Sequence, residues 1–119
     1  MPSEPSSSRS TDTALRDIQH HVGLAEAFTT GFVLAAFKED LRTVYAVTRC
    51  LEIISEASRR LPDELKDRHP GIAWKQMAGA GNVYRHDYED VAAQIVWDTV
   101  QRALPPLKAA IEAELARLA

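Results

Sequence analysis

Apolar side chains recur every three or four residues through most of this chain, and this spacing constrains the fold more than any other feature. The clearest run lies between residues 39 and 60 and comprises Leu41, Val44, Val47, Leu51 and Ile54. Such a period places one apolar stripe along an α-helix. No stretch alternates with the two-residue period of a half-buried strand. The sequence therefore predicts an all-α protein.

Similar stripes predict the other helices. The first helix is expected to start near Thr13, capped by Thr11-Asp12, and to end at Thr29-Thr30-Gly31. Its stripe is Leu15, Ile18, Val22, Ala25 and Phe28. A short helix is expected over 63–68, a third long one from near Ile72 toward His86, and a last one after Asp90. The stripe of that last helix is Val91, Ile95, Val100, Leu104, Leu107, Ile111, Leu115 and Leu118. Short links between such helices predict an antiparallel bundle of four to five helices.

Prolines and glycines interrupt these patterns. Pro105-Pro106 is expected to kink or split the last helix, because neither residue can donate a backbone hydrogen bond. Pro70 keeps the preceding residue out of helical geometry, so His69 is predicted to be a surface turn residue. Gly79 and Gly81 weaken a helix interior, which favours close approach of another backbone, a partner helix or a ligand.

Length and composition restrict the class of protein. The 119 residues fit one domain, predicted over 11–119, after a Ser- and Pro-rich tail over 1–10 that is expected to be disordered. A net charge of −3 argues against coating nucleic acid through overall charge, but it allows a local basic site. Cys50 is predicted to be a buried free thiol. No signal-peptide or membrane-spanning segment is visible, so we expect a soluble, cytoplasmic protein.

Familiar metal and cofactor motifs are absent from the sequence. It has no HExxH, GxGxxG or GxxxxGK[ST] pattern. Adjacent His20 and His21 point about 100° apart on a helix, which does not suit a shared metal. We therefore predict neither a metal site nor a cofactor.

Residues 81–88, with the sequence GNVYRHDY, are chemically the richest segment of the chain. In a helix, Asn82 and His86 would share one face, and Arg85 and Tyr88 an adjoining one. A guanidinium beside an imidazole suits phosphate chemistry, since one group holds an anion and the other moves a proton. A helix end that carries solvated polar groups is the simpler alternative.

The segment GIAWKQMAGAGNVYRHDYEDVAAQIVWDTVQRALPPL, at 71–107, resembles the HepT-like toxins of the HEPN superfamily. Those proteins carry an arginine, four to six residues, a histidine, one residue and a tyrosine. The resemblance extends to LEIISEASRRLPDEL at 51–65 and covers roughly residues 13–118. It implies a HEPN-like helical domain and a homodimer in which two copies of the motif face each other.

The resemblance also implies an activity. The toxin members are ribonucleases that need no metal and cleave RNA by attack of the 2′-hydroxyl on the adjacent phosphate. His86 takes the histidine position, Tyr88 the tyrosine position, and Asn82 the asparagine that often follows the family's arginine. Arg85 is the neighbouring cation, so Arg85 and His86 are the expected catalytic residues, with Asn82 supporting RNA or phosphate binding.

The chain departs from the family pattern at Gly81, where the usual form has arginine. Arg85 lies four residues later, so its long side chain can lean back toward that position in a helix. Moving the root of an arginine changes how its planar fork meets a phosphate. A catalytically weak or inactive subunit that only binds a partner is therefore the alternative, and a plain structural bundle is a third.

The resemblance implies a protein partner as well. HepT-like toxins are commonly paired with a minimal nucleotidyltransferase antitoxin of the MNT type, which can transfer AMP to the motif tyrosine. That residue is Tyr88 here. An adenylate would add negative charge and bulk beside an RNA-binding site and so exclude RNA. If the resemblance carries no function, Tyr88 packs a helix end through its ring.

Overall fold

The computed structural model describes residues 3–83 and 89–119, with side chains over 9–79 and 91–119. Helices follow one another in the order α1 (Ser3–Thr29), α2 (Leu34–Glu39), α3 (Leu41–Arg59), α4 (Asp63–Asp67), α5 (Trp74–Val83), α6 (Glu89–Asp98), a π-helix η1 (Thr99–Ala103) and α7 (Leu104–Leu118). No strand occurs in this described part, so the predicted all-α class is confirmed. The helices outnumber the four to five expected, because the link α2 is itself helical and the last helix has three parts, while α4 matches the short helix predicted over 63–68.

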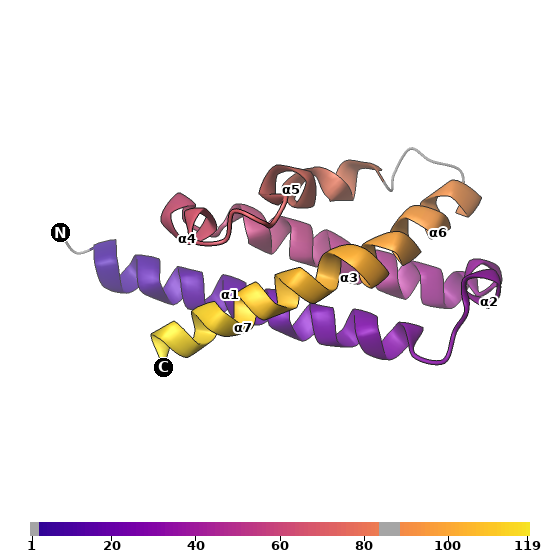
Figure 1. Cartoon of the computed structure of the whole chain (residues 1–119), viewed down its shortest axis with the longest axis horizontal. Helices are drawn as coiled ribbons and strands as arrows, with labels where there is room; N and C mark the ends of the chain where they lie inside the picture. Colours follow the sequence, from indigo (N-terminus) through magenta and orange to yellow (C-terminus); the bar gives the residue numbers. More distant parts are fainter. Residues whose placement is uncertain (1–2, 84–88) are drawn as a thin grey trace.

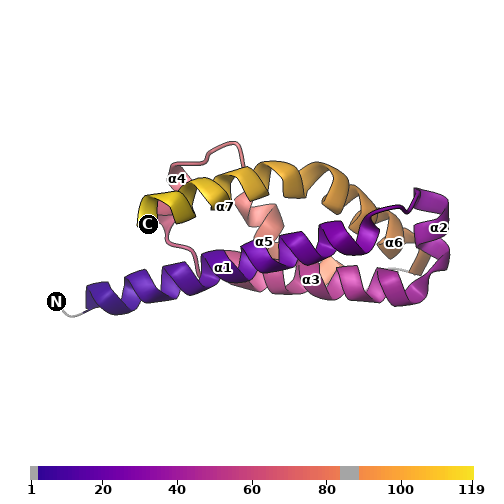
Figure 2. The same cartoon turned by 90° about the horizontal axis from the view of Figure 1, so that it is seen from below.

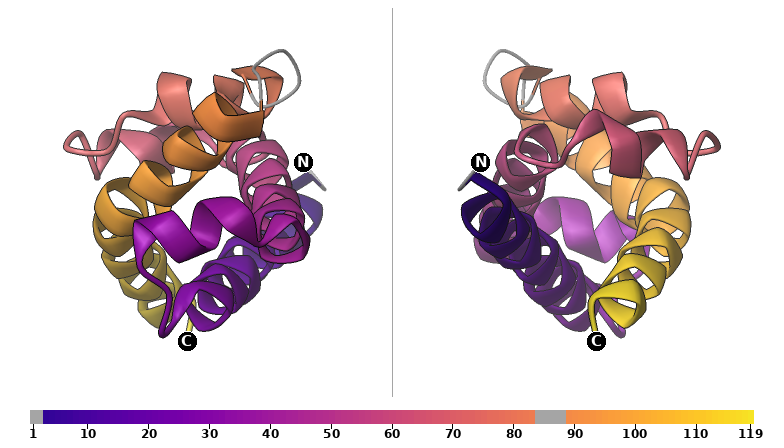
Figure 3. Two further views of the ribbon diagram at one scale, coloured as in Figure 1. Left: turned by 90° about the vertical axis from the view of Figure 1, so that its right-hand side faces the viewer. Right: turned by 90° about the vertical axis from the view of Figure 1, so that its left-hand side faces the viewer.

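The long helices surround one core (Figures 1 and 3). α1 packs antiparallel along α3, α5 lies on α3, and the rod formed by α6, η1 and α7 crosses α1 and α2. Figure 2 shows α7 lying over α1, and the start of α1 extending beyond the other helices. The largest fully buried side chains include Phe37, Leu15, Ile18, Ile54, Leu104, Leu107 and Ile111. The apolar stripes predicted from the sequence therefore supply most of the core.

Local sequence explains where several helices begin and end. Asp40 caps α3, because its side chain accepts a hydrogen bond from the backbone N–H of Thr43 at 3.1 Å. α1 ends at Thr29, and Gly31 follows with a φ of 87°, a conformation that glycine adopts without strain. α1 begins at Ser3, within the segment expected to be a tail and earlier than the predicted start near Thr13. Pro5 lies in its first turn, where the missing N–H has no helical partner to lose.

Some members of the predicted stripes are more exposed than expected. The exposed ones are Phe28 at 38%, Leu41 at 42%, Val91 at 46% and Leu118 at 49%. Each lies within the first or last three residues of its helix. A stripe continues to the end of a helix, but the neighbouring helices do not always reach that far. Periodicity therefore predicts the buried face correctly and overestimates its length.

The last helix continues past its two prolines, but its geometry becomes irregular just before them. α6, η1 and α7 follow without a loop, and Pro105 and Pro106 lie in the first turn of α7. The backbone N–H of Leu104 donates to the carbonyl oxygen of Thr99, five residues earlier, as in a π-helix. The widened turn lets the rod continue past two residues that cannot donate. Within the described ranges, no helix combines the length and apolarity that crossing a bilayer requires.

Candidate functional site

The predicted site residues belong to the connection between α5 and α6. Asn82 lies in the last turn of α5, and its side chain is outside the described part of the structure. Arg85, His86 and Tyr88 fall between Val83 and Glu89 and are likewise outside the described residues. The structure thus describes the two helices that lead into and out of the predicted site, and their anchoring can be traced.

α5 is fixed to the core by one partly buried hydrogen bond and by the side chain of Met77. The hydroxyl of Ser55, fully buried on α3, donates to the carbonyl oxygen of Ala78 at 2.8 Å. Met77 is buried in the core cluster. Apart from the nearby backbone of its own helix, no described atom would lie within 4 Å of a Cβ added at Gly79, so close packing among the described residues does not explain that glycine. Approach by a partner helix or a ligand stays a prediction, and a simple weakness of the helix is the alternative.

α6 is fixed by aromatic packing and by two buried apolar residues. The ring centroids of Trp97 and Phe37 lie 5.2 Å apart, which joins α6 to α2. Ala93 and Val96 are almost completely buried. Both helices that flank residues 84–88 are therefore held by the same core, which gives the predicted site a stable base.

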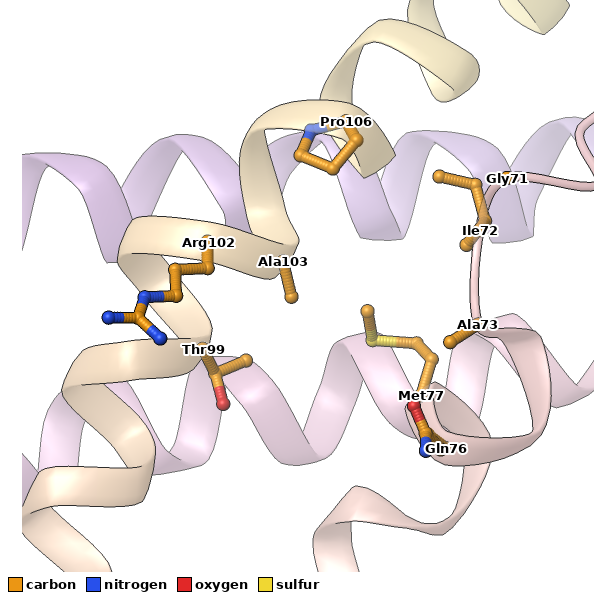
Figure 4. A pocket seen from close by; sticks show the side chains of 9 residues that line it. All are labelled: Gly71, Ile72, Ala73, Gln76, Met77, Thr99, Arg102, Ala103 and Pro106. Atoms are coloured by element: carbon orange, nitrogen blue, oxygen red, sulfur yellow. The ribbon is translucent and has the colours of Figure 1, made fainter.

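A groove lies between the start of α5 and the π-helix (Figure 4). This α5–η1 groove has a volume of about 340 Å³ and is lined by residues 71–73, 76 and 77 on one side and 99, 102, 103 and 106 on the other. Met77 and Ala103 point toward each other across it, whereas the guanidinium of Arg102 lies at the rim and is directed away from them. The groove was not predicted from the sequence.

A second polar feature, the Glu114 cluster, joins α7 to the turn after α4. Arg68 donates from Nε and Nη2 to the Glu114 carboxylate at 3.1 and 2.7 Å, and Nε2 of His69 lies 2.6 Å from Oε2 of Glu114. Glu114 itself is only 3% exposed. His69 lies in a turn as predicted, but its side chain is only 20% exposed, because its ring faces this buried carboxylate.

These contacts explain a displaced pKa. The hydrogen bonds from Arg68, with a further contribution from His69, lower the pKa of Glu114 to about 2, although burial opposes this. The same carboxylate raises the pKa of Arg68. Trp74 completes the turn by donating from its indole nitrogen to the carbonyl oxygen of His69 at 3.1 Å. Each side chain of this cluster has at least one polar partner, which is typical of a structural element.

The remaining candidates contribute no site in the described structure. No group of three or more potential metal-ligating side chains occurs over the residues searched, which exclude the predicted site. The rings of His20 and His21 meet edge to face, with centroids 5.0 Å apart, on the surface of α1. Cys50 is buried as predicted, and burial raises the pKa of its thiol, so the less reactive protonated form predominates.

Comparison with known proteins places the chain in a family. The model of the family described as "Ribonuclease HepT-like" matches residues 18–114, which include both the helical frame and the segment with His86. The chain belongs to the HepT-like ribonuclease family. The resemblance inferred from residues 71–107 is thereby confirmed.

Individual relatives agree with the HepT-like assignment. A "Probable ribonuclease HepT" of Thermococcus cleftensis is 38% identical over 104 residues, which cover 87% of this chain and 94% of the relative. A "Putative RNase" of Methanocaldococcus jannaschii is 32% identical over 98 residues, covering 82% and 81%, respectively. Another from the same organism is 31% identical over 106 residues, covering 89% and 97%. No solved structure matches the chain.

Proposed function

We propose that this HepT-like protein is a metal-independent endoribonuclease, with Arg85 and His86 as its catalytic residues. The observation that carries the proposal is the family match over 18–114, because it extends through the segment that holds both residues. The anchoring of α5 and α6 supports it, since acid–base catalysis needs a rigidly held imidazole.

The proposed reaction is an internal transesterification. His86 in its neutral form accepts the proton of the RNA 2′-hydroxyl, and the 2′-oxygen attacks the adjacent phosphorus. The bond from phosphorus to the 5′-oxygen of the next nucleotide breaks, and that oxygen takes a proton from an acid. The products are a 2′,3′-cyclic phosphate and a free 5′-hydroxyl. Arg85 stabilises the negative charge that develops on the phosphate oxygens.

A homodimer would complete this chemistry. Two copies of the segment facing one groove would supply one imidazole as base and a second as acid. They would also concentrate positive charge locally in a chain whose net charge is −3. Analytical ultracentrifugation tests this part of the proposal, and a protein that remains monomeric while it cleaves RNA would contradict it.

The central experiment compares wild type with His86→Ala on a labelled single-stranded RNA in the presence of EDTA. We expect cleavage by the wild type with cyclic-phosphate ends, and a loss of at least about 100-fold in the variant, the usual size of acid–base help. His20→Ala is the matched control, because His20 is an exposed histidine remote from the segment in sequence. Equal cleavage by wild type and His86→Ala, or cleavage only with added metal, would refute the mechanism.

The second candidate function is a non-catalytic subunit that binds a nucleotidyltransferase. Gly81 in place of the family's arginine favours it. Gly81→Arg discriminates between the two functions. A gain of tenfold or more in cleavage means that the natural protein is a weakened nuclease. If the wild type does not cleave and Gly81→Arg does not restore activity, the binding function is favoured.

The toxin–antitoxin role forms the last part of the proposal. We expect the protein to arrest growth when expressed alone and to be neutralised by a minimal nucleotidyltransferase that transfers AMP to Tyr88. Mass spectrometry after incubation with that partner and ATP should show a mass increase of one adenylate or a multiple of it. The increase should disappear in Tyr88→Phe and persist in Tyr45→Phe, a control at an exposed tyrosine of α3. Modification retained in Tyr88→Phe would assign it elsewhere.

A further inference from the structure

The α5–η1 groove combines an apolar interior with a single charge at its rim. Met77 and Ala103 face each other inside it, and Ile72 and Pro106 extend the apolar wall (Figure 4). Its volume of about 340 Å³ falls at the lower end of the range for small-ligand sites. Arg102 is the one charged residue among those that line it. A flat apolar group with an attached anion fits this arrangement.

Arg102 differs from the arginines that stabilise the fold. Arg60 pairs with Asp17, and Arg68 with Glu114, at distances of 3.0 and 2.7 Å. Arg102 is exposed and makes no hydrogen bond or ion pair with any residue that the structure describes. A guanidinium without a carboxylate partner keeps its planar fork available for the two oxygens of a phosphate.

Pro105 and Pro106, beside the groove, remove two backbone N–H donors from the rod. In a regular helix the carbonyl oxygens of Gln101 and Arg102 would accept from the residues four positions later. Those residues are Pro105 and Pro106, which carry no N–H. The exocyclic amino groups of adenine, cytosine and guanine are donors that could bind a carbonyl oxygen left without its helical partner. The amide of Gln76, across the groove, offers both a donor and an acceptor.

The groove lies between the two helical elements that flank the predicted catalytic segment in the sequence. Its walls come from α5 and from the rod that begins with α6, the two helices joined by residues 84–88. At 1.5 Å per residue, Arg102 lies roughly 20 Å along the rod from Glu89. A phosphate bound there is therefore not the phosphate that reacts near the start of α6, but one farther along the same strand.

We propose that the α5–η1 groove is a nucleotide subsite for single-stranded RNA, with one base against Met77 and Ala103 and a backbone phosphate on Arg102. This proposal rests on RNA being the substrate, and it adds a binding site remote from the reacting bond. The subsite contributes affinity for RNA long enough to span the distance between the two places.

Binding to an uncleaved RNA tests the subsite separately from catalysis. In the His86→Ala background, Arg102→Ala should weaken the binding of a single-stranded 20-mer about fivefold in fluorescence anisotropy. It should also lower the salt dependence of binding by about 0.7, the value for one phosphate on a single strand. The matched control is Arg59→Ala, another exposed arginine without a partner in the described structure, at the end of α3. It should leave both quantities unchanged.

A second variant tests the apolar part of the groove. Ala73 is exposed at the mouth, so Ala73→Trp fills the space without entering the core. Ala73→Trp should weaken RNA binding by a similar factor. In the double variant, Arg102→Ala should weaken binding by a smaller factor than it does alone, since both substitutions act on the binding of one nucleotide. Thermal melts and sedimentation are expected to match those of the parent protein.

The outcomes separate this proposal from that for the catalytic residues. If Arg102→Ala binds RNA as tightly as Arg59→Ala does, the subsite is refuted, whether or not the wild type cleaves. If Ala73→Trp changes the oligomeric state and leaves RNA affinity intact, the groove is a protein interface and the proposal is also refuted. A wild type that binds RNA through Arg102 but does not cleave it would refute the catalytic mechanism and support the subsite.

Discussion

The Glu114 cluster and the α5–η1 groove treat their charged groups in opposite ways. In the cluster, Arg68 and His69 both bind one buried carboxylate, so each charge has a partner within the chain. In the groove, Arg102 has no partner among the described residues. In the cluster, the charged side chains stabilise the fold. In the groove, the guanidinium of Arg102 stays available for a ligand. The two regions should therefore respond differently to the same kind of mutation.

The largest expected effect is on stability, at the cluster. Glu114→Ala should lower the free energy of unfolding by roughly 3–5 kcal/mol, because it leaves the Arg68 charge and the ring of His69 without their shared partner. Chemical denaturation measures the change. Glu112→Ala, at an exposed position of α7, is the control and should change stability by less than about 0.5 kcal/mol. A loss equally small for Glu114→Ala would remove the contrast between the regions.

Acid should weaken the cluster next. The folded-state pKa of Glu114, about 2, lies below its unfolded value of 4.5, so its contribution is complete above pH 4.5. That contribution, about 3 kcal/mol, declines as the pH falls from 4.5 toward 2. Denaturation at several pH values should show it, and Glu114→Gln should flatten the profile over this range. An unchanged profile in Glu114→Gln would assign the acid sensitivity to other groups.

A smaller effect is expected at His69. His69→Ala removes one hydrogen bond to a charged group but leaves the two-pronged contact from Arg68 intact. The loss should be about 1–2 kcal/mol in thermal or chemical unfolding. His20→Ala, on the surface of α1, provides the comparison and should be close to neutral. A loss at His69 as large as that at Glu114 would mean that the histidine, not the arginine, dominates the cluster.

The smallest expected effect on stability is at the groove. Arg102→Ala should change the free energy of unfolding by less than about 0.5 kcal/mol, because no described group depends on this side chain. The same denaturation assay applies, with Arg59→Ala in parallel. A loss above 1 kcal/mol would show that Arg102 supports the fold, and the distinction between the two regions would fail at this point.

The sequence predicted the helical frame well because the period of its apolar residues is a local property. It did not predict the pairing of His69 with Glu114, since the two residues lie 45 positions apart and only folding brings them together. One signal was present, because Glu114 lies three residues after Ile111 and seven after Leu107, on the buried stripe of α7. An acidic residue in that position needs a partner.

The candidate site residues also differ in how far the sequence alone could identify them. His86 was identified from a family pattern in the local sequence, and Arg85 was chosen as the cation next to it. Both stay predictions as site residues. Arg102 has no such mark, since in the sequence it is one more charge on a helix. Its significance comes from the groove beside it, which is a property of the folded chain. Ligand sites built from ordinary residues become visible only at that level.

The π-helix Thr99–Ala103 separates the C-terminal rod into two segments that pack against different helices. α6 keeps its contacts with α2 and α3, and α7 keeps its contacts with α1. A regular helix would tie the rotation of one segment rigidly to that of the other. The widened turn absorbs a mismatch of about one residue between them. In related chains, the insertion or deletion of a single residue can therefore be tolerated at this turn. Elsewhere along the rod, the same change would rotate the following part of the helix and expose its buried face to water.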